Sequence, residues 1–189
     1  MWHDLLGDAR FHASLLNLDR RIAAEARVRG CPVCGGALHV ASYPRKPRGV
    51  AGLPDEHDLR LSFCCAQEGC RKRTTPASVR FLGRRVYLGT IVVLVAVLRH
   101  GAAATRIRDL QDLVGVSRRT VERWCRWWRT ALTKTAFWRG ACGGFAEPVV
   151  VAQLPVSLLE RFQGAAEEQL LRLLRFLGPL TGGLRSRGI

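Results

Sequence analysis

The residues in this sequence best suited to chemistry are cysteines that occur in two clusters. The first cluster, CPVCGG, places Cys31 and Cys34 in a C-P-x-C-G pattern. Two thiolates from one tight turn can reach the same ion, and the glycines permit the bend. The second cluster, CCAQEGC, supplies Cys65 and Cys70 at C-x4-C spacing. Two cysteine pairs flanked by strand-like sequence predict a zinc ribbon in which four thiolates bind one Zn²⁺ ion.

The neighbouring cysteines Cys64 and Cys65 leave a choice for the third ligand. Side chains alternate along a strand, so Cys65 shares a face with Phe63 and Cys64 points the other way. The side chains predicted on the two faces are Leu59, Leu61, Phe63 and Cys65 against Arg60, Ser62 and Cys64. We therefore predict Cys65 as the ligand, with Cys64 as the open alternative. His39 and His57 lack knuckle spacing and are interpreted as surface or loop residues. Four thiolates leave no position for water, which predicts a structural site.

Neither a membrane segment nor a secretory signal is expected. Spanning a bilayer takes about 18 or more apolar residues, and the nearest run, Val86–Leu98, is shorter and flanked by arginines. We interpret this run as a buried helix. The first residues lack a basic start followed by an apolar stretch. We expect a cytoplasmic, nucleoid-associated protein in a reducing compartment, where clustered cysteines bind metal more often than they form disulfides.

The excess positive charge lies in the middle of the chain. The formal net charge of the 189 residues is +15. Residues 71–139 hold 16 Arg and Lys against 3 Asp and Glu, whereas residues 1–70 hold 9 against 8 and residues 140–189 hold 5 against 4. Such a local excess indicates a polyanionic partner. Nucleic acid is favoured over a merely solubilising face, because balanced charges would serve solubility equally well, and over an anionic membrane.

The stretch TRIRDLQDLVGVSRRTVERWCRWWRTAL predicts a helix-turn-helix. Apolar residues at helical spacing over 107–114 form one face, Gly115 breaks the helix, and Ser117 is a suitable N-cap for the next one. In the second helix, Val121, Trp124, Cys125 and Trp128 form the apolar face. We expect Trp124 and Trp128 to pack in the core rather than to stack on bases. The run over 87–98 would be the supporting first helix.

An exposed, arginine-rich surface on the second helix suits the major groove. Arginine can bind guanine in a bidentate manner there, and backbone amides at a helix start can hold phosphate. A basic segment directly after the second cysteine pair adds a further cationic surface. The residues predicted to bind double-stranded DNA are Arg71, Lys72, Arg73, Ser117, Arg118, Arg119, Thr120, Arg123 and Arg126.

The remaining sequence predicts a mainly α fold with a small β zinc ribbon and a trihelical helix-turn-helix core. Phe11, Leu15 and Leu18 begin an apolar stripe along a first helix over Asp8–Arg29, which Gly30 ends. The expected parts are an N-terminal amphipathic helix over 1–30, a zinc ribbon over 31–80, a helix-turn-helix domain over 81–140, and a linker, amphipathic helix and flexible tail over 141–189. The linker is FWRGACGGFAEP.

A final amphipathic helix is expected over Ser157–Leu177, followed by a disordered tail from Thr181. Its apolar residues are Leu158, Leu159, Phe162, Leu170, Leu173, Leu174 and Leu177. They either form a homodimer or partner surface, or pack on the chain's own helical core. The sequence leaves the two interpretations equally open.

The order of these motifs resembles a known family. A CPxCG knuckle, a second cysteine pair followed by RKRTTP, and a helix-turn-helix with SRRTVERW are similar to the DNA-binding portion of bacterial insertion-sequence transposases and their small associated proteins. The resemblance covers about Cys31–Leu132. It implies that the four cysteines hold zinc and that the helix over 117–129 reads terminal DNA. Transposases also need an RNase H-like domain with three carboxylates that hold two metal ions. The residues after Leu132 show no strand pattern that could form the sheet of such a domain, so we expect the catalytic domain to be absent.

We therefore expect a non-catalytic, zinc-stabilised DNA-binding protein that acts with a separate transposase polypeptide or as an orphan insertion-element protein. A transcriptional regulator of similar build is one alternative. An RNA-binding zinc-ribbon protein is another, in which the ribbon and its basic flank hold a structured RNA. An enzyme is disfavoured because no nucleophile motif and no open His/Cys metal site is present in the sequence.

Overall fold

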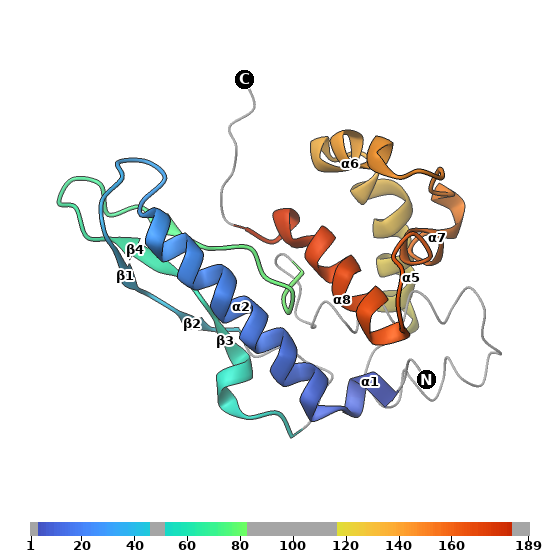
Figure 1. The fold of residues 1–189 in the computed structure, drawn as a ribbon, viewed down its shortest axis with the longest axis horizontal. Coiled ribbons are helices and arrows are strands. Elements are labelled where there is room, and N and C mark those ends of the chain that lie inside the picture. The colour runs from blue at the N-terminus through green and yellow to red at the C-terminus, as the bar shows by residue number, and fades with distance from the viewer. Residues whose placement is uncertain (1–3, 46–51, 83–116, 183–189) are drawn as a thin grey trace.

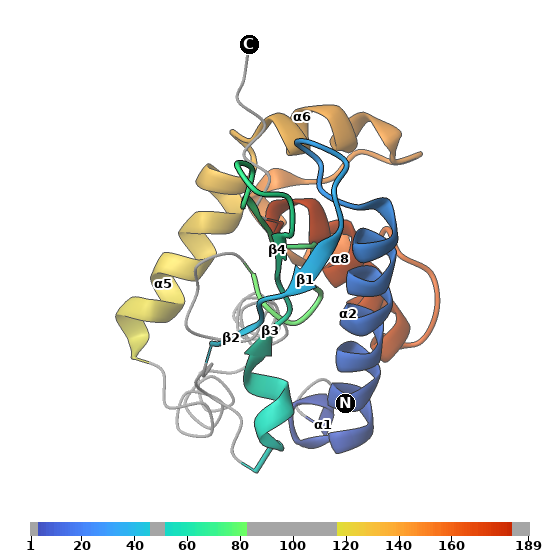
Figure 2. The same cartoon turned by 90° about the vertical axis from the view of Figure 1, so that its left-hand side faces the viewer.

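A computed structural model of the chain describes residues 4–45, 52–82 and 117–182, and it is mainly helical with a small antiparallel sheet (Figure 1). The sheet lies beside a long helix at one end of the molecule, and shorter helices form the other end. Helix α8 lies between the long helix α2 and helix α5, as Figures 1 and 2 both show. The predicted fold class is confirmed at this level.

Helix α2 spans Ala9–Arg29 and follows a single helical turn, α1, at Asp4–Gly7. The Asp8 carboxylate accepts a hydrogen bond from the backbone N–H of Arg10, and Gly30 ends the helix with φ of 76°. Phe11, Leu15 and Leu18 are buried, which confirms the predicted apolar stripe. The helix therefore begins and ends where the sequence indicates.

Strands β1, β4 and β5 form a three-stranded antiparallel sheet in the order β1-β4-β5, and β2 pairs with β3. Their bounds are β1 Leu38–Val40, β2 Tyr43–Pro44, β3 Leu59–Arg60, β4 Phe63–Cys65 and β5 Arg73–Thr74, with a 3₁₀ turn at Asp55–Asp58 before β3. Leu38 is paired with Cys65 across β1 and β4. This register brings the segment after the first cysteine pair beside the strand that begins the second.

The described helical part begins at the predicted second helix of the helix-turn-helix. Its elements are α5 Arg118–Arg126, a π-helix at Trp127–Leu132, α6 Ala136–Ala141, α7 Val156–Leu159 and α8 Ala166–Phe176, with 3₁₀ turns at Cys142–Gly144, Val151–Gln153 and Gly178–Leu180. The predicted helices over 87–98 and 107–114 lie outside the described residues, so the trihelical arrangement stays a prediction.

Two apolar clusters form the core. The larger contains Phe11 and Leu15 of α2, Trp124 and Trp128 from the α5 region, and the buried leucines of α7 and α8. The smaller one lies under the cysteines and includes Ala26, Leu38 and Phe63 with Cys31 and Cys65. Helix α2 contributes to both clusters, so it joins the cysteine end of the molecule to the helical end.

A buried polar network reinforces this junction. The Asp19 carboxylate, which is 2% exposed, accepts hydrogen bonds from Ser78 Oγ at 2.6 Å, Val79 N at 2.7 Å and Arg80 Nε at 2.8 Å. The Arg80 guanidinium also donates to the carbonyl of His57 at 2.6 Å and that of Leu59 at 2.7 Å. The segment that leaves the sheet is thereby attached to α2 through a buried ion pair.

Helix predictions for the C-terminal third need two corrections. The expected single helix over 157–177 is two helices, α7 and α8, separated near Gly164, whose φ is 109°. The expected linker contains α6, which begins because the Thr135 hydroxyl caps the N–H of Trp138 at 3.0 Å. Six of the seven apolar residues predicted for this helix are buried within the chain and Phe162 is half-buried, as in the second interpretation of their role. The buried residues are Leu158, Leu159, Leu170, Leu173, Leu174 and Leu177.

Around β3 the predicted alternation is wrong. Leu59 is 39% exposed and Arg60 is 4% exposed, because the Arg60 guanidinium donates to the carbonyls of Pro76 and Thr181. His57, expected to be a surface or loop residue, is buried in the 3₁₀ turn before β3, and neither of its ring nitrogens has a hydrogen-bond partner among the described residues. Thr181, expected to begin a disordered tail, is buried and accepts a hydrogen bond from the N–H of Ser78.

Candidate metal centre and basic surfaces

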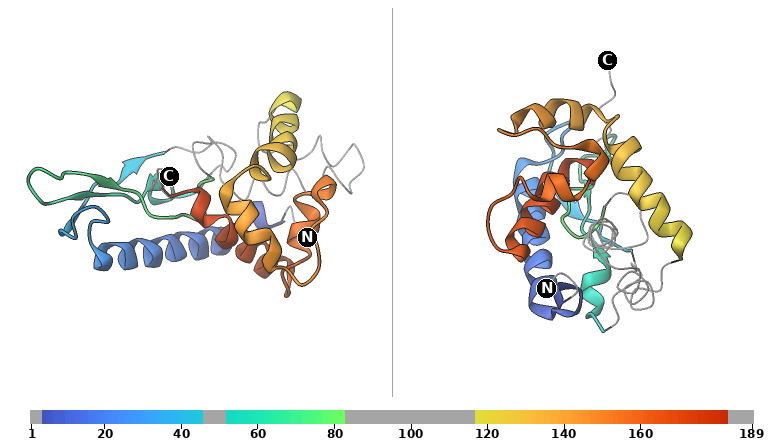
Figure 3. Two further views of the ribbon diagram at one scale, coloured as in Figure 1. Left: turned by 90° about the horizontal axis from the view of Figure 1, so that it is seen from above. Right: turned by 90° about the vertical axis from the view of Figure 1, so that its right-hand side faces the viewer.

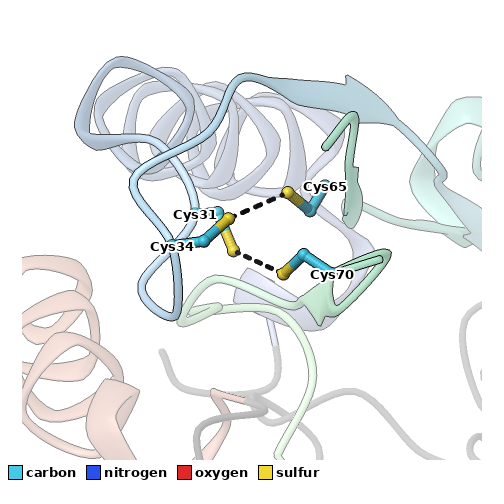
Figure 4. A group of neighbouring side chains, drawn as sticks. All are labelled: Cys31, Cys34, Cys65 and Cys70. Carbon is cyan, nitrogen blue, oxygen red and sulfur yellow. Dashed lines mark hydrogen bonds between the residues drawn. The ribbon is translucent and has the colours of Figure 1, made fainter. Parts of the chain in front are cut away.

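The sulfur atoms of the four predicted ligands lie close together and point toward one another (Figure 4). The Sγ atoms of Cys34 and Cys65 are 3.4 Å apart, those of Cys31 and Cys70 are 3.7 Å apart, and all four lie within 4.8 Å of one another. Four ligands at ~2.3 Å from a tetrahedral ion would be about 3.8 Å apart. The cluster therefore has the dimensions of a possible four-thiolate metal site.

Two loops deliver the cysteines. The first follows α2 and carries Cys31 and Cys34, and the second joins β4 to β5 and carries Cys65 and Cys70. Gly36 lies against the sulfurs, and a Cβ atom there would approach the Sγ of Cys65 to 3.3 Å and that of Cys34 to 3.4 Å. A glycine at this position keeps the two loops close enough for their sulfurs to meet.

Backbone N–H groups point at the first cysteine of each loop. Hydrogen bonds from Val33 N–H and then Cys34 N–H lower the pKa of the Cys31 thiol to about 7. In the second loop, Gln67 N–H donates to Cys65 Sγ at 3.4 Å. Burial nonetheless raises the pKa of the Cys65 thiol above its usual value. Such N–H groups orient sulfur ligands and stabilise the thiolate form that metals bind.

The fifth clustered cysteine, Cys64, is not part of this group. Its half-buried thiol donates instead to the carbonyl of Arg71 at 3.4 Å. Strand alternation at β4 thus separates the two neighbouring cysteines as predicted, with Cys65 buried among the four sulfurs. Neither His39 nor His57 belongs to the cluster, which among the described residues contains cysteines alone.

The three cations after Cys70 differ in whether they contact other parts of the chain. Arg71 and Lys72 are exposed. Arg73 has an exposed side chain too, but its Nη1 donates to the Ala41 carbonyl at 3.0 Å, and its guanidinium lies 5.5 Å from the centre of the Tyr43 ring. Of the three cations predicted to bind DNA here, Arg73 therefore has a structural role in holding β5 to the loop between β1 and β2.

Helix α5 has a buried aromatic face and an exposed cationic face. Its N-cap is Ser117, whose hydroxyl accepts a hydrogen bond from Thr120 N–H at 3.3 Å, as predicted. Trp124 and Trp128 are 1% and 0% exposed, so they pack in the core as expected. Arg119, Arg123 and Arg126 are exposed and Thr120 is half-buried. Arg118 is the first residue of the helix.

An open hollow of about 400 Å³ lies beside the cationic face of α5. Arg126 and Arg129 line it together with Glu122, Cys125 and Thr130. Arg129, which is not among the residues predicted to bind DNA, donates from its Nε to the carbonyl of Cys125 at 3.4 Å. The cysteine loops and α5 lie toward opposite ends of the long axis (Figures 1 and 3). The two groups of cations are thus separate surfaces.

No protein-family model, no curated protein and no solved structure matches this chain. Among the residues that the structure describes, no helix combines the length and the apolar character needed to cross a membrane.

Proposed function

We propose that this chain is a non-catalytic DNA-binding protein whose four clustered cysteines hold one structural zinc ion. Zinc accepts four thiolate ligands in a tetrahedron, and the sulfur separations of 3.4 and 3.7 Å agree with that geometry. Two ligand loops that come from separate parts of the sequence would be held together by the ion. Cys31, Cys34, Cys65 and Cys70 would hold it, and its contribution is to the folding free energy rather than to a reaction.

The observation that carries DNA binding is the two-sided character of α5. Trp124 of α5 and Trp128 of the π-helix that follows it are buried in the core, which fixes the orientation of the helix. Arg119, Arg123 and Arg126 are exposed. None of these three guanidinium groups has a hydrogen bond or ion pair within the described part of the chain. Arg119 lies in the first turn of α5, and Arg123 and Arg126 lie in its last turn. A rigid helix with exposed arginines along its length suits insertion into the major groove, where arginine binds guanine.

The free cations at the cysteine end support a second contact. Arg71 and Lys72 are exposed on the loop that carries Cys70. This loop and α5 lie toward opposite ends of the molecule. We infer that a duplex lying along the long axis contacts the protein at two places, with α5 at the bases and the cysteine end at phosphates. The resemblance in motif order supports a role beside a bacterial transposase, and the closing of the metal site by four thiolates supports the absence of catalysis.

The test is titration of the full-length, zinc-loaded chain with DNA duplexes, first selected from a random pool, at several salt concentrations. We expect Arg119→Ala and Arg123→Ala to weaken binding to the selected duplex by about 1–3 kcal/mol for each base that the removed guanidinium binds in the wild type. Arg21→Ala is the matched control, since Arg21 is exposed in the middle of α2. Equal affinity of all three variants would contradict the assignment of α5 to the groove. Preference for duplex RNA over DNA in the same titration would refute DNA as the ligand.

A further inference from the structure

The two cysteine loops share one hydrogen-bond plan. In the first loop, the N–H of Cys31 donates to the carbonyl of Gly36 at 2.8 Å. In the second, the N–H of Cys65 donates to the carbonyl of Lys72 at 2.9 Å. In each loop the acceptor lies two residues beyond the second cysteine. The residue directly after that cysteine is therefore equivalent in the two loops, and it is a glycine in the first and Arg71 in the second.

Both equivalent residues have left-handed backbone. The φ angle is 73° at Gly35 and 43° at Arg71, which is the one non-glycine residue with positive φ among the residues that the structure describes. Glycine adopts this conformation without steric cost, whereas an L-residue with a Cβ atom is strained there. The loop geometry thus favours glycine at both positions, and the fold alone gives no reason for an arginine.

The side chain of Arg71 does not hold its loop in place. It is exposed, and it forms no hydrogen bond or ion pair with any described residue, while its backbone carbonyl accepts from the Cys64 thiol. The contrast is Arg73, two residues later, whose guanidinium is held by the carbonyl of Ala41 and the ring of Tyr43. A strained backbone together with a free guanidinium indicates that the arginine at this position serves to bind a ligand.

We propose that Arg71 is a position-specific phosphate contact, held in the left-handed conformation by the second cysteine loop. This inference rests on the proposed DNA-binding function. It assigns the contact between the cysteine end and the DNA phosphates to one side chain. The Arg71 guanidinium would donate two parallel hydrogen bonds to two oxygens of one phosphate. A fixed backbone conformation orients the guanidinium for this contact, whereas a flexible loop would not.

Three variants of the full chain separate charge, strain and position. Arg71→Ala removes the charge and keeps the strained Cβ atom, and Arg71→Gly removes both. The double variant Arg71→Gly with Gly35→Arg moves the arginine to the equivalent position of the first loop and restores the net charge. A side chain fits at Gly35, because a Cβ atom there would meet nothing within 4 Å.

We measure DNA affinity against salt concentration, and the melting temperature of each zinc-loaded variant. Arg71→Ala and Arg71→Gly should each bind about eightfold more weakly at 0.1 M salt and lower the salt slope by about 0.9, as expected when one phosphate is no longer neutralised. Arg71→Gly should melt about 2–4 °C above Arg71→Ala. The double variant should remain as weak as Arg71→Gly.

Wild-type affinity in Arg71→Gly, or recovery of affinity in the double variant, would overturn the inference and leave the proposed function standing, because the wild-type chain would still bind DNA. A wild-type chain that binds no duplex at any salt concentration would refute the proposed function itself, and the inference with it.

Discussion

The buried pair of Asp19 and Arg80 allows a stability prediction whose size follows from the structure. Both side chains are 2% exposed, and the Asp19 carboxylate is the acceptor for Ser78 Oγ, Val79 N and Arg80 Nε. In Asp19→Ala these three donors have no acceptor, and one of them carries a charge that stays buried. Breaking a buried pair in this way costs about 3–5 kcal/mol, which is a large part of the 5–15 kcal/mol that stabilises a typical domain.

The assay is urea unfolding of the zinc-loaded chain, followed by circular dichroism and tryptophan fluorescence. With a slope of about 2 kcal/mol per molar urea, the midpoint should fall by about 2 M. The matched control is Glu25→Ala on the same helix, because Glu25 is 70% exposed and its ion pair with Arg29 spans 4.0 Å. Removing that surface pair should change the free energy of unfolding by less than about 0.5 kcal/mol.

A double variant provides the internal check. Asp19→Leu with Arg80→Met removes both charges, so it should be more stable than Asp19→Ala, which leaves Arg80 unpaired. A decrease in the free energy of unfolding below about 1 kcal/mol in Asp19→Ala would refute the reasoning, since it would mean that the carboxylate is not the acceptor that attaches the segment after the sheet to α2. A double variant less stable than the single one would refute the account of the buried charge.

Two further predictions concern the helical core and the cysteines. Trp128→Ala should lower the free energy of unfolding by about 3–5 kcal/mol and Trp127→Ala by clearly less, because Trp128 is fully buried and Trp127 only partly so. Urea unfolding measures both changes. Equal decreases in the two variants would contradict this packing. Zinc binding at pH 7 should release between about three and four protons, because the pKa of Cys31 is about 7 whereas those of Cys34, Cys65 and Cys70 are raised. Calorimetry in buffers of different ionisation enthalpy counts the released protons. Release of one proton or none would contradict binding by four thiolates.

Local patterns predicted the parts of this fold that local physics determines. The stripe from Phe11 along α2, its cap at Asp8 and the cap of α5 at Ser117 follow from side chains within a few residues of each other. The selection of Cys65 over Cys64 follows from strand alternation. Tryptophans four residues apart on one helix face, such as Trp124 and Trp128, are buried for the same reason of periodicity.

The features that sequence reasoning missed depend on partners far away in the chain. Asp19 interrupts an apolar helix face, and only its hydrogen bonds to residues 78–80 explain its burial. Arg60 is buried because the carbonyl it reaches belongs to Thr181, 121 residues later. β3 has only two residues, too few for alternation to decide which of them faces inward. The left-handed φ of Arg71 likewise depends on a loop closed by the pairing of β4 with β5.

The central claim is that Cys31, Cys34, Cys65 and Cys70 hold one zinc ion, and metal analysis of the purified chain tests it most directly. The decisive comparison is Cys65→Ser with Cys64→Ser, because these neighbours differ in whether the sulfur belongs to the cluster. We predict about one zinc per chain in the wild type and in Cys64→Ser, and a clear decrease in Cys65→Ser. A metal-free wild type, or zinc that is absent from Cys64→Ser and kept by Cys65→Ser, would contradict the account.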